Sequence, residues 1–312
     1  MSRIDEALRR AADESTGTVS TDGDTVPQPV TGEDIAVLAR ESFAVAVAEP
    51  ARNRSRPAAD PSFTADQDAP PRRSRSLFDR IDRRLAEKVV LDQNMAPGSR
   101  EQYRRLAAVL HDAQANDGVH VVMLASAVAG EGKTLTATNL ALTLSESYHR
   151  RVLLIDADLR KPALHNVFKI NSTAGLSEGL HPDGASKLIV RQISERLSLL
   201  PGGRPNSDPM ASLTSDRMRK LVEEAKEAFD WVIIDTPPLV ILPDANLLAS
   251  MVDAAVLVVR AQSTPHHLVK RAVDAIGSKR ILGVVLNQAS AKDMPYGAYY
   301  ESYYAGDAEG TD

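Results

Sequence analysis

A loop of small residues followed by lysine and threonine is the clearest place in the sequence for chemistry. The run AVAGEGKT, residues 127–134, has the spacing of a phosphate-binding loop: Gly or Ala, four residues, then Gly-Lys-Thr. In such a loop backbone N–H groups converge on the β-phosphate at the start of a helix. Lys133 would reach the β- and γ-phosphates, and the Thr134 hydroxyl would bind Mg²⁺. A glycine-rich turn that binds nothing is the alternative. The predicted nucleotide contacts are Ala129, Gly130, Glu131, Gly132, Lys133, Thr134 and Leu135.

Two apolar segments farther along the chain end in aspartates. Asp156 and Asp158 follow the run Leu-Leu-Ile, and Asp235 follows the run Val-Ile-Ile. Ligands of an open parallel sheet bind at the carboxyl ends of its strands, so we expect these carboxylates to converge on the loop. Isolated buried carboxylates are costly, and a hard Mg²⁺ ion would satisfy them. A capped turn is the alternative for either segment taken alone.

Tyrosines gather at the C-terminal end of the sequence. Five of the seven fall within the last 17 residues, namely Tyr296, Tyr299, Tyr300, Tyr303 and Tyr304. The surrounding segment has no apolar period, and residues 291–312 hold one lysine against five acids, a charge of −4. We expect a flexible tail that enters an active site as substrate, that of a neighbouring subunit. Packing of an aromatic tail on its own domain or on a partner is the alternative.

Helices and apolar strands that would position these residues alternate from residue 100 onward. The predicted strands are 119–125, 151–156, 197–200, 231–235, 254–259 and 281–286. The predicted helices are 101–115, 133–147, 208–229 and 265–277. Strands that are apolar throughout and joined by helices indicate a mostly parallel sheet covered on both faces. Right-handed crossovers make this a doubly wound α/β domain.

The first 97 residues have a different composition from the rest. They hold eight of the 18 prolines, three phenylalanines, and no tyrosine or tryptophan. Such a segment buries too little apolar surface to offset chain entropy. We therefore predict a mostly disordered extension (1–97) with short amphipathic helices near residues 4–8 and 77–85, a P-loop domain (98–290) and the tyrosine tail (291–312). The arginine-rich stretch 72–84 would favour an anionic membrane surface or be a solvated linker.

Composition excludes several classes of protein. The 312 residues are 43% apolar and 25% charged, and the net charge of −5 is too mild to indicate nucleic-acid binding. The absence of cysteine removes disulfides, iron–sulfur clusters, thiolate zinc sites and cysteine nucleophiles. No apolar run approaches the roughly 18–20 residues of a membrane helix, and the N-terminus lacks the apolar core of a signal peptide. We expect a cytoplasmic protein.

The motifs together resemble one family. The loop and the strand ends LLIDADLRKP and VIIDTPP are similar to those of the bacterial tyrosine kinases of polysaccharide export, over about residues 98–305. These are P-loop enzymes with a MinD/ParA-like fold. The LPGG stretch at 200–203, the NSDP helix entry at 206–209 and the tyrosine cluster share the resemblance. The start MSRIDEALRR resembles the cytoplasmic subgroup, and within it the autokinases that accompany exosortase gene clusters.

The resemblance implies roles for individual residues. Lys133, Asp156 and Asp158 would be catalytic, with Asp156 contacting a metal-bound water or accepting the tyrosine proton. Three residues would hold Mg²⁺: Thr134, Asp158 and Asp235. Asn287 stands where related enzymes read the base, although an asparagine that caps a loop is the alternative.

Two departures from related patterns bear on the class and on assembly. MinD- and ParA-type proteins carry a signature lysine where this chain has Val128, which disfavours that subfamily. The kinases often have an E-x-x-R-x-x-R helix that builds a ring oligomer. Here Glu101 and Arg104 fit, but the third position is Ala107, so a ring built in this way is in doubt.

The resemblance predicts an ATP- and Mg²⁺-dependent autokinase that phosphorylates its own tail in trans and regulates exopolysaccharide polymerisation and export. The implied partners are an inner-membrane chain-length or copolymerase activator, a cognate tyrosine phosphatase and further copies of the chain, with no nucleic acid. The activator would recruit the protein to the inner membrane. Two alternatives remain: a MinD/ParA-like positioning ATPase that transfers phosphate only to water, and a nucleotide-gated scaffold.

Overall fold

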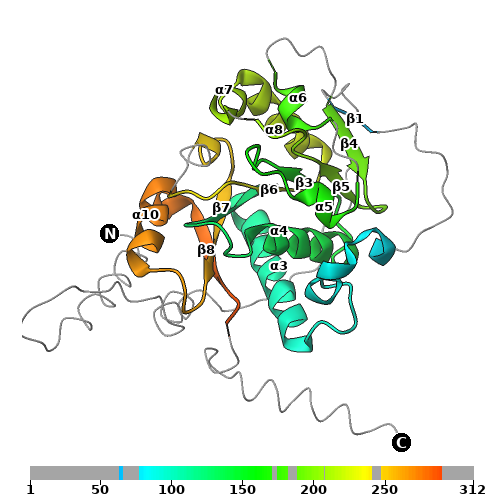
Figure 1. Cartoon of the computed structure of the whole chain (residues 1–312), viewed down its shortest axis with the longest axis vertical. Helices are drawn as coiled ribbons and strands as arrows, with labels where there is room; N and C mark the ends of the chain where they lie inside the picture. Colours follow the sequence, from blue (N-terminus) through cyan, green and yellow to red (C-terminus); the bar gives the residue numbers. More distant parts are fainter. Residues whose placement is uncertain are drawn as a thin grey trace, which may run out of the picture.

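The computed structural model describes residues 63–65 (backbone only), 77–170, 174–181, 188–206, 208–240 and 247–289 (Figure 1). The expected disorder of most of the N-terminal extension, the helix near residues 4–8 and the whole tyrosine tail lie outside these residues. No helix within the described ranges has the length and apolar character needed to cross a membrane.

A twisted sheet of eight strands forms the centre of the molecule, in the order β1-β4-β5-β3-β6-β2-β7-β8. The six strands from β5 to β8 in this order run parallel, whereas β4 is antiparallel to β5. The bounds are β1 (Phe63–Ala65), β2 (Val121–Ser126), β3 (Val152–Asp156), β4 (Leu188–Gln192), β5 (Leu197–Leu200), β6 (Trp231–Asp235), β7 (Ala254–Arg260) and β8 (Ile281–Asn287). The predicted doubly wound, mostly parallel sheet is confirmed.

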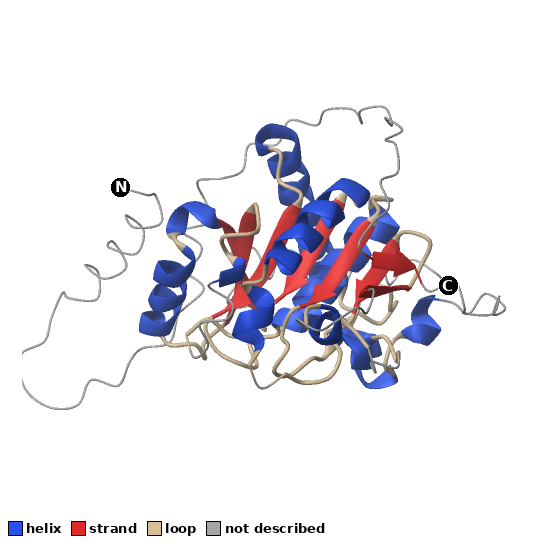
Figure 2. Ribbon diagram, turned by 90° about the horizontal axis from the view of Figure 1, so that it is seen from above, coloured by secondary structure: helices blue, strands red, loops and turns tan. Residues whose placement is uncertain are grey.

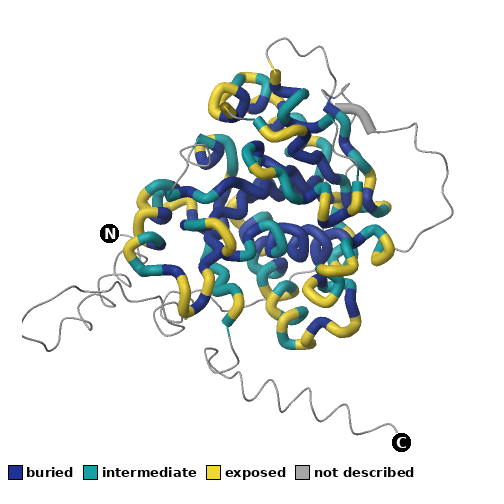
Figure 3. The backbone as a smooth tube through the Cα atoms, viewed as in Figure 1, coloured by how far each residue is buried: buried dark blue, intermediate teal, exposed yellow. Residues whose placement is uncertain are grey.

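Helices cover both faces of the sheet (Figure 2). One face carries α3 (Pro97–Asp117), α4 (Lys133–Leu142) and α5 (Leu164–Val167). The other carries α6 (Leu176–Gly179), α7 (Pro209–Leu213), α8 (Asp216–Ala228) and α10 (His266–Ile276). Successive strand residues alternate between two apolar cores, as a pleated strand requires: in β6, Val232 and Ile234 pack on one side and Trp231 and Ile233 on the other. Figure 3 shows these strands as the buried centre of the chain.

Several elements differ from the prediction. The helix expected at 208–229 is divided into α7 and α8, because the Ser215 hydroxyl accepts a hydrogen bond from the Met218 N–H and so begins a new helix. The helix expected at 133–147 ends at Leu142 and continues as the π-helical turn η3 (Thr143–Ser147). The strands β1 and β4 were not predicted.

The segment directly before α3 belongs to the domain. It forms two 3₁₀ helices, η1 (Leu77–Arg80) and η2 (Arg83–Lys88), where the pattern predicted an amphipathic helix. The side chains of Ile81 and Val89 are fully buried. Asn139 of α4 fastens the segment, because its Oδ1 accepts from the Val90 N–H (2.9 Å) and its Nδ2 donates to the Lys88 carbonyl (2.9 Å). The strand β1 and the segment from Leu77 onward therefore belong to the domain, although both lie ahead of the predicted boundary at residue 98.

The helix α3 does not complete the ring-forming motif. Arg104 pairs with Glu101 of the same helix at 3.6 Å. Ala107, at the third position of the motif, faces the core and has no exposed surface. The doubt about a ring held by this motif therefore has a structural basis: a side chain at the third position points into the protein.

Candidate active site

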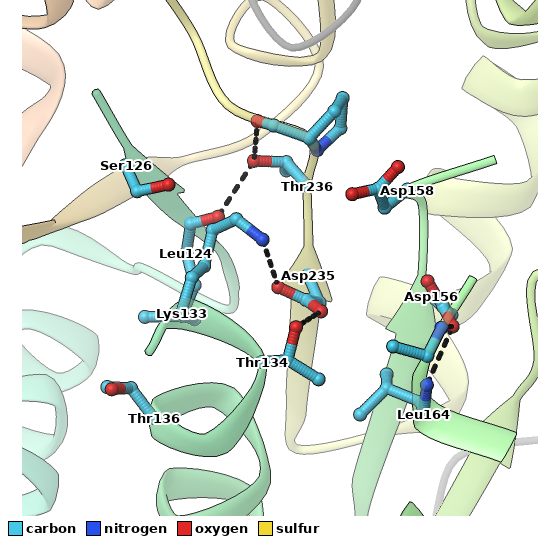
Figure 4. A network of polar contacts seen from close by, with 12 residues as sticks. Leu124, Ser126, Lys133, Thr134, Thr136, Asp156, Asp158, Leu164, Asp235 and Thr236 are labelled. Carbon is cyan, nitrogen blue, oxygen red and sulfur yellow. Dashed lines mark hydrogen bonds and ion pairs between the residues drawn. The ribbon is translucent and has the colours of Figure 1, made fainter. Parts of the chain in front are cut away.

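Three neighbouring strands deliver the predicted site residues to one edge of the sheet. The order β3-β6-β2 places the ends of these strands side by side, and Asp156 and Asp235 are register partners. The phosphate-binding loop follows β2 and leads into α4. Figure 4 shows Asp235 between Lys133 and Thr134 on one side and, on the other, Asp156 at the end of β3 and Asp158 after it. Convergence of the loop and the carboxylates is therefore observed.

The loop depends on two glycines. Gly130 and Gly132 have φ angles of 85° and 87°, in the left-handed region that other residues adopt only with strain. At Gly132 space is also limited, since a Cβ atom would lie 1.9 Å from Nδ2 of Asn287. Ala129 and Gly130 at the tip are exposed, and Leu135 is partly buried. The backbone at the tip of the loop is therefore accessible, whereas position 132 has no room for a side chain.

Asp235 joins the start of α4 to the end of β6. Its Oδ1 accepts from Lys133 Nζ at 2.8 Å, and its Oδ2 accepts from the Thr134 hydroxyl at 2.6 Å. Lys133 and Asp235 are both buried, so this ion pair is shielded from solvent screening. The lysine, the hydroxyl and the acid of a phosphate site are therefore already assembled.

Asp156 has one carboxylate oxygen without a partner. Its Oδ2 accepts from the N–H groups of Ala163 (2.9 Å) and Leu164 (3.0 Å). Its Oδ1 is buried and has no hydrogen-bond partner among the described residues. Burial, together with the negative charge of Asp235, raises the pKa of Asp156 from 3.8 to about 7. Near neutral pH this carboxyl group can both accept and release a proton.

Asp158 follows Asp156 by two residues and is partly buried. Burial raises the pKa of its carboxyl group, and its Oδ1 accepts from the Lys161 N–H at 3.1 Å. Its second oxygen can take part in binding a ligand.

The oxygen atoms at this edge fit a magnesium ion. The Thr134 hydroxyl, the carboxylates of Asp158 and Asp235, and the unpartnered Oδ1 of Asp156 are hard donors of the kind that Mg²⁺ prefers. Within the described part of the chain no group of three or more acidic or histidine side chains could by itself hold a metal. The donor set therefore suits an ion that is also bound by substrate phosphates, as Mg²⁺ is in phosphoryl-transfer sites.

Two predicted nucleotide contacts have side chains engaged within the protein. The Glu131 carboxylate turns inward and is almost completely buried. Asn287 donates from Nδ2 to the Glu131 carbonyl at 2.8 Å, and its Oδ1 accepts from the Gln288 N–H at 2.9 Å. Asn287 thus lies against the loop. Its proposed contact with the base stays a prediction.

One residue of the site was missed from the sequence. Thr264, just before α10, donates its hydroxyl to Glu131 Oε1 at 2.5 Å and is buried. No motif marks it, because it lies 133 residues from its partner in the chain. The five predicted phospho-acceptor tyrosines lie outside the described residues.

The fold and the loop define a P-loop nucleotide-binding protein. A model of the AAA domain matches residues 119–276, which is half of the chain. The tyrosine-protein kinase YwqD of Bacillus subtilis is 36% identical over 203 residues, covering 64% of this chain and 85% of that protein. The tyrosine-protein kinase CpsD of Streptococcus agalactiae is 35% identical over 184 residues, covering 57% and 80%.

The chain is also similar to solved structures, and these include a bacterial tyrosine kinase domain. The kinase domain of the Escherichia coli tyrosine kinase ETK superposes with a TM-score of 0.60 at 29% identity, covering 72% of this chain and 88% of that one. The chimerical protein CapA2B2 gives 0.57 at 28% identity, covering 64% and 88%. The chain belongs to the family of bacterial P-loop tyrosine-protein kinases.

The family assignment confirms the predicted class of enzyme and disfavours the positioning ATPase, because the relatives are named as tyrosine kinases. The exosortase-associated subgroup stays a prediction.

Proposed function

We propose that this kinase transfers the γ-phosphoryl group of ATP to the tyrosines of its own C-terminal tail. The observation that carries the proposal is that Lys133 and Thr134 both donate to the Asp235 carboxylate, at 2.8 and 2.6 Å, close to Asp156 with its unpartnered oxygen.

Each residue has a distinct task in this proposal. The backbone N–H groups of residues 129–134 bind the phosphates, and Lys133 offsets their negative charge. Thr134, Asp158 and Asp235 would hold Mg²⁺, which would supply further positive charge at the transferred group.

Asp156 is placed to accept a proton. A phenol has a pKa near 10 and is protonated at neutral pH. When its oxygen attacks the γ-phosphorus, the bond to the leaving ADP oxygen breaks and the phenolic proton must go to a base. With a pKa of about 7, Asp156 is a stronger base than an ordinary carboxylate.

The end of the last described strand supports the tail as the acceptor. β8 ends at Asn287, whose side chain contacts the phosphate-binding loop, so the last strand before the tail ends beside the site. A tail of charge −4 gains about −1.5 to −2 charges with each phosphate. Repulsion between the phosphates and the acidic site would release the tail and weaken an oligomer held by it. Transfer between subunits is part of the proposal.

The biological setting rests on the resemblance of the motifs. We propose that the kinase acts in the cytoplasm and regulates exopolysaccharide polymerisation and export. An inner-membrane chain-length or copolymerase protein would stimulate it, and a tyrosine phosphatase would reset it.

Labelled ATP tests the proposal. The full chain, incubated with γ-labelled ATP and Mg²⁺, should incorporate label on tail tyrosines. The Lys133→Met variant should incorporate none, and a variant with all five tail tyrosines changed to phenylalanine should lose most of the label. Equal incorporation by the five-phenylalanine variant and wild type would show that the acceptor lies elsewhere. A Lys133→Met variant that keeps its function in cells would instead support a nucleotide-gated scaffold.

A further inference from the structure

The carboxylate of Glu131 is an unusual feature of the phosphate-binding loop. The side chain belongs to the loop that would surround a polyanion, yet it carries a negative charge. It points into the protein, where 1% of its surface is exposed. No ion pair with Glu131 occurs in the part of the chain that the structure describes, so hydrogen bonds alone stabilise the buried charge.

Three donors satisfy this carboxylate. Oε2 accepts from the Val128 N–H at 2.8 Å, within the loop itself. Oε1 accepts from the Thr264 hydroxyl at 2.5 Å and from the Arg260 N–H at 3.3 Å. Hydrogen bonds to a charged acceptor are roughly twice as strong as neutral ones, and an unmet buried charge is costly. The end of β7 and the turn after it therefore hold the phosphate-binding loop through the carboxylate of Glu131.

The same contacts continue to the end of β8. The Glu131 carbonyl accepts from Asn287 Nδ2 at 2.8 Å, and the Asn287 carbonyl accepts from the Ala261 N–H at 2.9 Å. The phosphate-binding loop, the turn at 260–264 and the last strand are therefore linked in a closed ring of hydrogen bonds. We call Glu131, Thr264 and Asn287 the loop latch.

The loop latch has two physical consequences for a bound nucleotide. It fixes the loop backbone, whose N–H groups must be oriented before the phosphates arrive. It also holds a carboxylate away from a polyanion, since a like charge beside the phosphates would oppose binding. Thr264 is essential to both effects, because its hydroxyl is the only side-chain donor to the carboxylate among the described residues.

We propose that Thr264 and Glu131 are positioning residues of the nucleotide site, with the Thr264 hydroxyl keeping the Glu131 carboxylate turned away from the phosphates. The inference deepens the proposed function, on whose nucleotide site it rests, but needs no transfer to tyrosine. Thr264 touches neither the nucleotide nor the tail in this role.

ADP binding to the full chain tests the proposal, measured by calorimetry with Mg²⁺ present. Thr264→Val keeps the shape of the side chain and removes the donor, and should raise the Kd for ADP about tenfold, as expected for loss of a hydrogen bond to a charged group. Thr264→Ser keeps the hydroxyl and should restore binding to within about twofold of wild type.

A matched control separates positioning from simple stability. Thr143→Val also removes a buried hydroxyl, one that donates to the Asn139 carbonyl far along α4. It should lower the melting temperature without changing the Kd. If Thr264→Val does not fold, Thr264→Ala removes the same hydroxyl without placing a methyl group against the carboxylate.

A double-mutant cycle locates the effect. In a Glu131→Gln background no charge has to be held, so Thr264→Val should raise the Kd less than it does in wild type. An unchanged Kd in Thr264→Val, equal weakening by Thr264→Ser, or equal effects in both backgrounds would overturn the proposal. Failure of tail phosphorylation with ADP binding intact would contradict the proposed function and leave the loop latch standing.

Discussion

Replacing Asp156 by asparagine should change the pH dependence of stability in a defined direction. The folded-state pKa of about 7 lies above the usual value of 3.8 because the carboxyl group is buried close to Asp235. Between these two values the folded state holds a proton that the unfolded state has lost. Stability is therefore greatest at acid pH and decreases as the pH rises toward 7.

The size of the effect follows from the shift. About two pH units of the interval from pH 5 to pH 8 lie below the folded-state pKa, and each unit corresponds to 1.36 kcal/mol. The free energy of unfolding should therefore fall by about 3 kcal/mol as the pH rises from 5 to 8, because of the titration of Asp156. Asparagine keeps an acceptor for the N–H groups of Ala163 and Leu164 and carries no titrating proton. The variant should lose this dependence and be more stable than wild type at pH 8, while losing kinase activity.

Urea unfolding at pH 5, 6, 7 and 8 measures the effect. Asp253→Asn is a control of opposite sign. Burial alone would raise the pKa of Asp253, but hydrogen bonds from Lys226 and from the N–H groups of His120 and Val121 outweigh it and lower the pKa. The stabilising effect of the Asp253 carboxylate is lost only below pH 4. The Asp253→Asn variant should therefore be destabilised equally at pH 5 and pH 8. Parallel pH profiles for wild type and Asp156→Asn would refute the reasoning.

Three further substitutions test the phosphate-binding loop, the segment before α3 and the core face of α3. Gly132→Ala combines a positive φ with the close contact to Asn287, so it should cost about 1–2 kcal/mol in backbone strain alone. It should also weaken ADP binding at least about tenfold. The control Gly118→Ala, at a φ of 68° with no neighbour within 4 Å, should lower only the melting temperature. Asn139→Leu removes two side-chain hydrogen bonds to the segment before α3 and should lower the free energy of unfolding by about 2–3 kcal/mol, measured with urea. Ala107→Arg buries a charge in the core and should lower it by about 3 kcal/mol or more, whereas Arg104→Ala on the surface should cost less than about 1 kcal/mol.

Much of the site was predictable because its position follows from topology. Apolar runs give the strands, and parallel strands bring their carboxyl ends to one edge. Asp156 and Asp235 could therefore be placed near Lys133 without coordinates, and the structure makes these acids register partners. β6 covers the predicted range 231–235.

Other parts were not predictable from local pattern. β4 has the sequence LIVRQ, which is apolar for only three residues, and its antiparallel pairing with β5 depends on tertiary contacts. The division between α7 and α8 depends on the Ser215 side chain as a cap, which does not interrupt the apolar period. The inward orientation of Glu131 required knowledge of Thr264, which is distant in the chain.

The central claim is that one nucleotide binds where the loop, Lys133 and the acids of β3 and β6 meet. A crystal structure of the full chain with ADP and Mg²⁺ measures this most directly. The account predicts phosphates on the N–H groups of residues 129–134, the ion beside Thr134 and Asp235, and Glu131 still facing Thr264. Nucleotide bound elsewhere, or acids that point away from the ion and phosphates, would contradict it.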